Sequence, residues 1–169
     1  MRQVFCARAG TGRTGAAPTT DGVASLHAHQ PRSEVAMRMR DPCHPTEDEL
    51  HTWAYSPGAE SPAVEWDWLL AVHMERGLLA RCVEYAADRE CPNAGFFLDV
   101  LYQWVEVVAR DKRFEVVRST YDEWLDVARG VQDAKVKDWR YRARLVFQNA
   151  EPFDRHRWSD IRIAARERE

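Results

Sequence analysis

The apolar and polar positions of this chain show their clearest pattern in the segment Cys91–Arg110, CPNAGFFLDVLYQWVEVVAR. From Ala94 onward its polar side chains are four in number, and at about 100° per residue they fall within roughly 60° of one another on a helix. We call them the polar stripe: Asp99, Gln103, Glu106 and Arg110. Because the rest of the circumference is apolar, such a helix needs neighbours on at least three sides. The pattern predicts the central helix of an all-helical domain.

Helical spacing of apolar residues before this segment predicts two or three shorter helices. The first is expected to begin at Thr46, since Thr46 and Glu49 form the T-x-x-E pattern of a capping box. The second is expected to begin with Ser61 as N-cap and Pro62 in the first turn, where proline is favoured. It bends or breaks near Gly77 and continues as a third helix.

Three further elements follow the central segment. Apolar residues at helical spacing predict one helix over residues 114–128, with an alternative start near Thr120, and Gly130 supplies a C-terminal stop. The next helix is expected over residues 133–150. Residues 154–169 have apolar side chains at helical spacing, but part of this tail also alternates as a strand does, so both interpretations stay open.

Residues 1–43 differ from the rest of the chain. They are rich in Gly, Thr, Ala and Pro, and they hold too few large apolar side chains to offset the cost of ordering them. We expect a disordered arm, or an upstream extension if translation begins at Met37 or Met39; a basic regulatory or transit-like arm is the third interpretation. Residues 44–169 are predicted to form one compact all-α domain. It should have six to seven short helices, arranged as a helical-repeat-like stack or an irregular bundle.

Composition narrows the setting of the protein more than its function. Only three of its 24 basic residues are lysine, a bias typical of a GC-rich bacterial genome. The four cysteines form no C-x-x-C pair, so free thiols in a bacterial cytoplasm are expected. No apolar run reaches the length of a membrane span, and no membrane association is predicted. The net charge of −3 gives no overall attraction to nucleic acid.

The charge is unevenly distributed along the chain. Residues 44–128 carry seven basic and seventeen acidic side chains, whereas residues 129–169 carry eleven basic and seven acidic ones. One interpretation is that the two segments pair with each other within the fold. The other is an acidic surface from residues 44–128 that binds a basic protein partner, as an immunity-like or regulatory adaptor does. No catalytic or cofactor motif is present, so we favour a non-enzymatic protein-interaction module that needs no cofactor.

The polar stripe is the candidate partner-binding site for such a module. Its first interpretation is the solvated edge of a mostly buried helix, in which Glu106 and Arg110 form an i, i+4 ion pair. Its second interpretation is the polar floor of a groove that receives a partner.

A nucleic-acid-associated protein is the alternative function, with residues 135–168 as the basic segment. Lys137, Arg140 and Arg144 share one helical face, which suits a phosphate backbone. Tyr141 and Trp158 interleave with the basic residues of this segment. The competing interpretation is that these bases pair with the surplus carboxylates of residues 44–128.

A metal-dependent helical-bundle enzyme is the third hypothesis. Asp48 and His51 form a D-x-x-H pair, and Cys43 and His44 lie close to it in sequence, but no second E-x-x-H pair completes a di-iron site and the spacing matches no zinc motif. Metal binding is therefore a weak expectation. Cys91 at a helix entry has two interpretations. We favour a packed side chain, and the alternative is a nucleophile whose pKa the helix N-terminus lowers.

Overall fold

The computed structural model describes residues 45–57, 66–148 and 153–167. The chain divides into two units, residues 1–34 and 35–169, and every described residue belongs to the second. The expectations for residues 1–43, including a start at Met37 or Met39, lie outside the described residues. So do Ser61 and Pro62, the expected start of the second helix.

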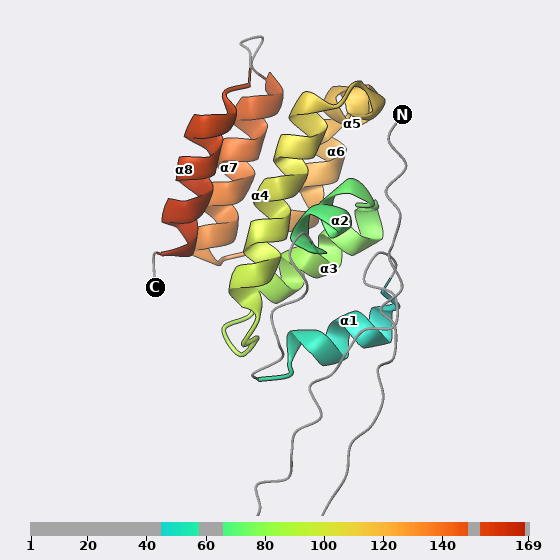
Figure 1. Ribbon diagram of the computed structural model, residues 1–169, viewed down its shortest axis with the longest axis vertical. Helices are drawn as coiled ribbons and strands as arrows, with labels where there is room; N and C mark the ends of the chain where they lie inside the picture. Colours follow the sequence, from blue (N-terminus) through green and yellow to red (C-terminus); the bar gives the residue numbers. More distant parts are fainter. Residues whose placement is uncertain (1–44, 58–65, 149–152, 168–169) are drawn as a thin grey trace, which may run out of the picture. The chain divides into compact units, whose positions relative to one another are not determined.

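Within the described ranges the secondary structure is entirely helical (Figure 1), so the all-α prediction is confirmed. The α-helices are α1 (Glu47–Ala54), α2 (Trp66–Val72), α3 (Arg76–Ala87), α4 (Ala94–Arg110), α5 (Glu115–Ser119), α6 (Tyr121–Leu125), α7 (Ala134–Gln148) and α8 (Arg155–Arg166). Two 3-10 helices, η1 (Lys112–Phe114) and η2 (Asp126–Ala128), complete the described elements. None of these helices combines the length and the hydropathy of a membrane span.

The predicted central helix is α4, and it packs against α2, α3, α7 and α8. Figure 1 shows α7 and α8 on one side of α4 and α2 and α3 on the other. The buried residues of α4 are Phe97, Leu98, Val100, Leu101, Tyr102, Trp104, Val105, Glu106, Val107 and Val108. One helix surrounded by several others is the arrangement of an irregular bundle, since repeats in a stack contact only their neighbours.

The N-terminus of α1 has the predicted capping box. The Thr46 hydroxyl accepts a hydrogen bond from the Glu49 amide, and the Glu49 carboxylate accepts one from the Thr46 amide at 3.0 Å. The other end of α1 is fixed by the turn before α4, where the Asn93 side-chain amide donates to the Trp53 carbonyl at 2.8 Å. Asn93 stands at the N-cap position of α4, but its side chain caps nothing there, because it is used to hold α1.

A second contact ties α1 to the turn that follows α3. The Tyr55 hydroxyl donates to the Asp88 carboxylate at 2.5 Å. This hydrogen bond raises the pKa of Tyr55 to about 12, since ionising the phenol would place two negative charges together, and it lowers the pKa of Asp88. The bond therefore holds α1 in place across the neutral pH range.

The single helix expected over residues 114–128 is wrong, because the structure divides it into η1, α5, α6 and η2. The break falls at Thr120, where the Ser119 and Thr120 hydroxyls both donate to the Val116 carbonyl, at 2.8 and 2.9 Å. Such side-chain bonds compete with the helical ladder. The expected alternative start near Thr120 coincides with the start of α6, and the division explains why the structure has more helices than expected. The break expected near Gly77 separates α2 from α3. Since α2 ends at Val72 and α3 begins at Arg76, Gly77 lies in the first turn of α3.

The tail forms α8, so its strand interpretation is wrong. Asp154 caps the helix, since its carboxylate accepts hydrogen bonds from the His156 and Arg157 amides at 2.9 and 3.2 Å. Trp158 is buried and its indole N–H donates to the Tyr102 carbonyl of α4 at 3.0 Å. This contact fixes α8 against the central helix.

Candidate functional site

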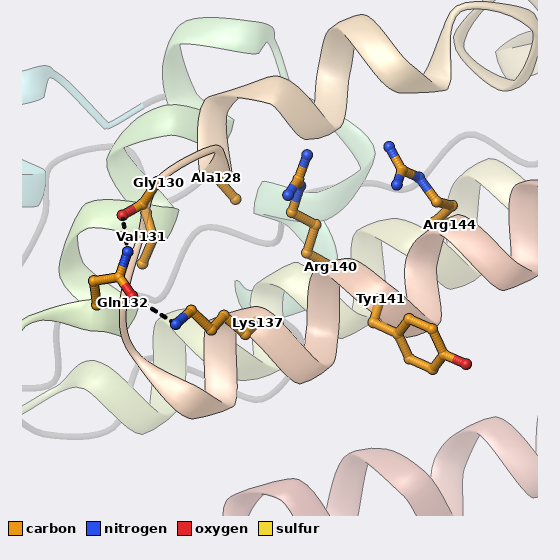
Figure 2. Close-up of a pocket in the computed structure, with 8 residues that line it drawn as sticks. All are labelled: Ala128, Gly130, Val131, Gln132, Lys137, Arg140, Tyr141 and Arg144. Carbon is orange, nitrogen blue, oxygen red and sulfur yellow. Dashed lines mark hydrogen bonds between the residues drawn. The ribbon is translucent and has the colours of Figure 1, made fainter.

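Lys137, Arg140 and Arg144, the three cations expected on one helical face, line a single cavity of about 250 Å³. We call it the α7 groove. Its lining residues, shown in Figure 2, are Ala128, Gly130, Val131, Gln132, Lys137, Arg140, Tyr141 and Arg144. They come from the last residue of η2, from the turn between η2 and α7, and from the first three turns of α7. The sequence spacing therefore predicted which cations gather, although it did not predict the turn that completes the groove.

Local sequence explains how α7 is positioned. Gly130 has a φ of +87°, a conformation that suits glycine, and this turn redirects the chain after η2. Asp133 then accepts hydrogen bonds from the Lys135 and Val136 amides at 2.9 and 3.0 Å, as an N-cap does. The core side of α7 carries Trp139, whose indole N–H donates to the Leu101 carbonyl of α4 at 2.9 Å. Because the Trp139 face of α7 is buried, Lys137, Arg140 and Arg144 lie at the edge of that buried face.

The two arginines of the groove reach toward α6 and η2, whereas the Tyr141 ring extends to the other side (Figure 2). Arg140 Nε donates to the Leu125 carbonyl at 3.1 Å, and Arg144 Nη2 donates to the Asp122 carboxylate at 2.8 Å. Arg144 Nε is buried and has no hydrogen-bond partner. The groove thus contains a guanidinium whose donors are only partly used.

At the opposite end of the groove, two hydrogen bonds link Lys137, Gln132 and Gly130. Lys137 Nζ donates to the Gln132 side-chain oxygen at 2.7 Å, and the Gln132 amide donates to the Gly130 carbonyl at 3.0 Å. Gln132 was not identified from the sequence, because nothing in its spacing distinguishes it. Both contacts are exposed, so they leave the ammonium group of Lys137 accessible to a ligand.

The chemistry of the lining is that of an anion-binding site. None of the eight lining residues carries a carboxylate, a thiol or an imidazole, and three of them are cationic. Arginine presents planar donors that match carboxylate and phosphate oxygens, and lysine adds a point charge. The groove is equipped to hold an anion rather than to transfer a proton or attack a carbonyl.

In the polar stripe of α4, the structure confirms the predicted ion pair between Glu106 and Arg110, at 2.7 Å. Arg155 of α8 lies 3.0 Å from the same carboxylate, and the Glu106 side chain is only 9% exposed. Glu106 was expected at a solvated edge, but α8 covers it. Arg155 was missed because the two residues are far apart in sequence.

The other residues of the stripe differ in their surroundings. The Gln103 amide donates to the Asp67 carboxylate of α2 at 2.8 Å, and Arg162 of α8 lies 3.8 Å from that carboxylate. Asp99 is half-buried and Arg110 is exposed. The stripe is a seam between helices, and a partner contact there stays a prediction.

The expected pairing of basic and acidic segments is present in part. Three arginines of residues 129–169 reach acids of residues 44–128: Arg144 to Asp122, Arg155 to Glu106 and Arg162 to Asp67. Trp158, expected to interleave with cations on a nucleic-acid surface, is instead buried in the core. These pairs remove several cations of the 135–168 segment from a shared basic surface.

The metal hypothesis gains no further ligand from the fold. His51 Nδ1 lies 3.4 Å from the Tyr85 hydroxyl, and Asp48 is exposed. Within the parts of the chain that the structure describes, no group of three or more His, Cys, Asp or Glu residues is placed to hold a metal ion. Cys43 and His44 lie outside those parts.

Of the two interpretations of Cys91, the structure supports the packed side chain and not the activated thiol. Its side chain is buried and its thiol donates to the Ala54 carbonyl at 3.2 Å, and burial raises the pKa of this thiol. Burial also raises the pKa of Cys82 to about 12. A buried site disfavours the charged thiolate, so neither group is activated as a nucleophile.

We therefore expect Cys82 and Cys91 to resist iodoacetamide in the native protein at about pH 8, since the thiolate is the reacting species. Both should react once guanidinium unfolds the chain. Peptide mass spectrometry after timed labelling measures the two sites separately. Native-state labelling of Cys91 as fast as in the unfolded chain would contradict the burial described here.

The chain matches no protein-family model, no curated protein and no solved structure in the three comparisons made. No relative therefore supplies a substrate or a partner. What the α7 groove does has to be inferred from its own side chains, their hydrogen bonds and the charges that surround them.

Proposed function

We propose that this protein is a non-enzymatic interaction module that holds an acidic segment of a partner protein in the α7 groove. The observation that carries the proposal is the meeting of Lys137, Arg140 and Arg144 around one cavity with no acid in its lining. The proposal keeps the partner-binding class expected from the sequence but reverses its polarity, with a basic site for an acidic partner.

A protein partner is favoured over nucleic acid by the amount of charge available. The three cations span about 10 Å along α7, whereas proteins that bind duplex DNA tightly neutralise about 6–10 phosphates. One of the three, Arg144, already faces Asp122. The chain as a whole carries a net charge of −3, which repels a long polyanion. A short acidic segment needs only the local field of the groove.

The test is fluorescence anisotropy with the full chain and three labelled probes: a glutamate-rich peptide, a single-stranded oligonucleotide of equal charge and a lysine-rich peptide. We expect the acidic peptide to bind at low salt and to dissociate as salt rises. The double variant Arg140→Gln plus Arg144→Gln should weaken it at least about tenfold, because charge-assisted hydrogen bonds are the strong ones.

The matched control is Arg113→Gln plus Arg129→Gln. It removes the same charge from two exposed arginines that pair with local acids and do not line the groove. Binding should change less than about twofold, as for surface cations in general. Preferential binding of the oligonucleotide, or equal losses in both double variants, would overturn the proposal.

The acidic surface remains a second candidate, for a basic partner. Arg81 bridges Glu47 of α1 and Glu84 of α3, yet both glutamates stay more than half exposed. Asp48 of α1 is exposed, and so is Glu90 in the turn that follows α3. The lysine-rich peptide is the probe for this surface, and Glu47→Gln plus Glu84→Gln is the variant that should weaken it.

A further inference from the structure

We propose that the α7 groove is specific for a phosphorylated side chain, and that Asp122 is a built-in competitor which a simple carboxylate ligand does not displace efficiently. This inference rests on the proposed function and names the ligand class for the same groove. Four observations carry it: the pairing of Arg144, the donors that remain available around the cavity, the size of the cavity and the exposure of its rim.

The first observation is that Arg144 already has a carboxylate. Asp122 of α6 lies 2.8 Å from Arg144 Nη2, and its side chain is 61% exposed. An aspartate or glutamate from a partner would exchange one monoanion for another and gain little. A phosphate monoester carries a charge of about −1.5 to −2 at pH 7 and three acceptor oxygens, so it gains by the exchange.

The second observation is the supply of donors. Arg144 Nε is buried, so a ligand reaches this guanidinium group through the Nη2 atom that now donates to Asp122. Arg140 uses Nε for the Leu125 carbonyl, and its Nη atoms donate to no other described residue. Figure 2 shows both guanidinium groups extending in the same direction from α7. The Nη atoms of Arg140, the ammonium group of Lys137 and the Nη2 atom that Asp122 now occupies can together serve a tetrahedral group with several oxygens. One carboxylate satisfies fewer of these donors.

The third observation concerns size. The cavity of about 250 Å³ is smaller than the 300–1,000 Å³ typical of pockets that enclose a whole small molecule. It suits the end of one side chain, with the rest of the ligand outside. A free nucleotide or coenzyme would leave most of its surface in water.

The fourth observation is the rim of the groove, where Tyr141 is 63% exposed. Leu145, one turn further along α7, is also exposed. An aromatic ring and an aliphatic side chain beside a cationic cavity give apolar contact area to the residues that flank a phosphorylated position. This arrangement fits a peptide segment better than an isolated phosphate ion.

The experiment compares three versions of one acidic peptide, with phosphoserine, aspartate or serine at its central position, on the full chain by anisotropy. We expect the phosphopeptide to bind at least about tenfold more tightly than the aspartate peptide. Its affinity should fall as pH is lowered from about 7.5 to about 5.5, since the second phosphate pKa is about 6. The affinity of the aspartate peptide should not follow that profile.

Asp122→Asn tests the competitor directly. Freeing Arg144 should tighten binding of the aspartate peptide about threefold to fivefold, the amount that a surface ion pair supplies. Asp126→Asn is the matched control, since Asp126 pairs with Arg129 outside the groove and the charge change is the same. It should leave the affinity within about twofold. Thermal unfolding of each variant verifies that it is folded.

Equal affinity for phosphoserine and aspartate, or no tightening in Asp122→Asn, overturns this inference. The proposed function survives that result if the acidic peptide still depends on Arg140 and Arg144. Binding of neither peptide overturns both. Tighter binding of a single-stranded oligonucleotide than of the phosphopeptide also overturns both, in favour of the nucleic-acid alternative.

Discussion

Replacing Trp139 with alanine is expected to lower the free energy of unfolding by about 3–5 kcal/mol. Trp139 is fully buried, lies 6.2 Å from Trp104 between ring centroids, and donates its indole N–H to the Leu101 carbonyl at 2.9 Å. The variant leaves a large cavity between α7 and α4, because close-packed neighbours relax only in part. Urea unfolding followed by circular dichroism measures the loss.

A pair of phenylalanine variants separates packing from hydrogen bonding. Trp104 is also fully buried, but its indole N–H has no hydrogen-bond partner. Trp139→Phe removes a hydrogen bond and Trp104→Phe does not, so the first should cost more, by about 1 kcal/mol. A larger loss of unfolding free energy in Trp104→Phe than in Trp139→Phe would contradict this difference in hydrogen bonding.

Much of the architecture could be predicted because its causes are local in the sequence. The one polar face of α4 and the Thr46–Glu49 capping box depend on residues only a few positions apart. The prediction of one helix over residues 114–128 was wrong for a reason that is also local. Its apolar stripe is real, but the Ser119 and Thr120 hydroxyls compete for the Val116 carbonyl and break the helix.

The α7 groove shows where prediction from sequence stops. Lys137, Arg140 and Arg144 share a face at spacings of three and four residues, which any helix produces. The partners of the two arginines, Asp122 and the Leu125 carbonyl, come from α6 and depend on how α6 packs against α7. No local pattern signals such a contact.

The distribution of acidic and basic residues along the chain also predicts contacts only in part. The surplus of acids in residues 44–128 and of bases in residues 129–169 predicted that some would pair. It did not predict which residues would pair. Two of the three pairs join α8 to α4 and α2, and the third joins α7 to α6.

The attachment of α8 gives the second large expected effect. Replacing Trp158 with alanine should lower the free energy of unfolding by about 3–4 kcal/mol and raise amide exchange in α8 more than in α4. Trp158 is buried, contacts the Tyr102 ring at 5.4 Å and donates to the Tyr102 carbonyl at 3.0 Å. Chemical denaturation and hydrogen exchange by mass spectrometry measure the two effects.

Arg155→Gln is the control, because it removes an ion pair between the two helices and leaves the buried indole in place. Arg155 is largely exposed, and Glu106 keeps its pair with Arg110 when Arg155 is lost. We expect a cost of at most about 1 kcal/mol, the usual scale of an exposed ion pair. If this variant destabilises α8 as much as Trp158→Ala does, the helix is held by charge rather than by the buried indole. In that case raised salt should release α8, whereas attachment through Trp158 predicts that salt has little effect.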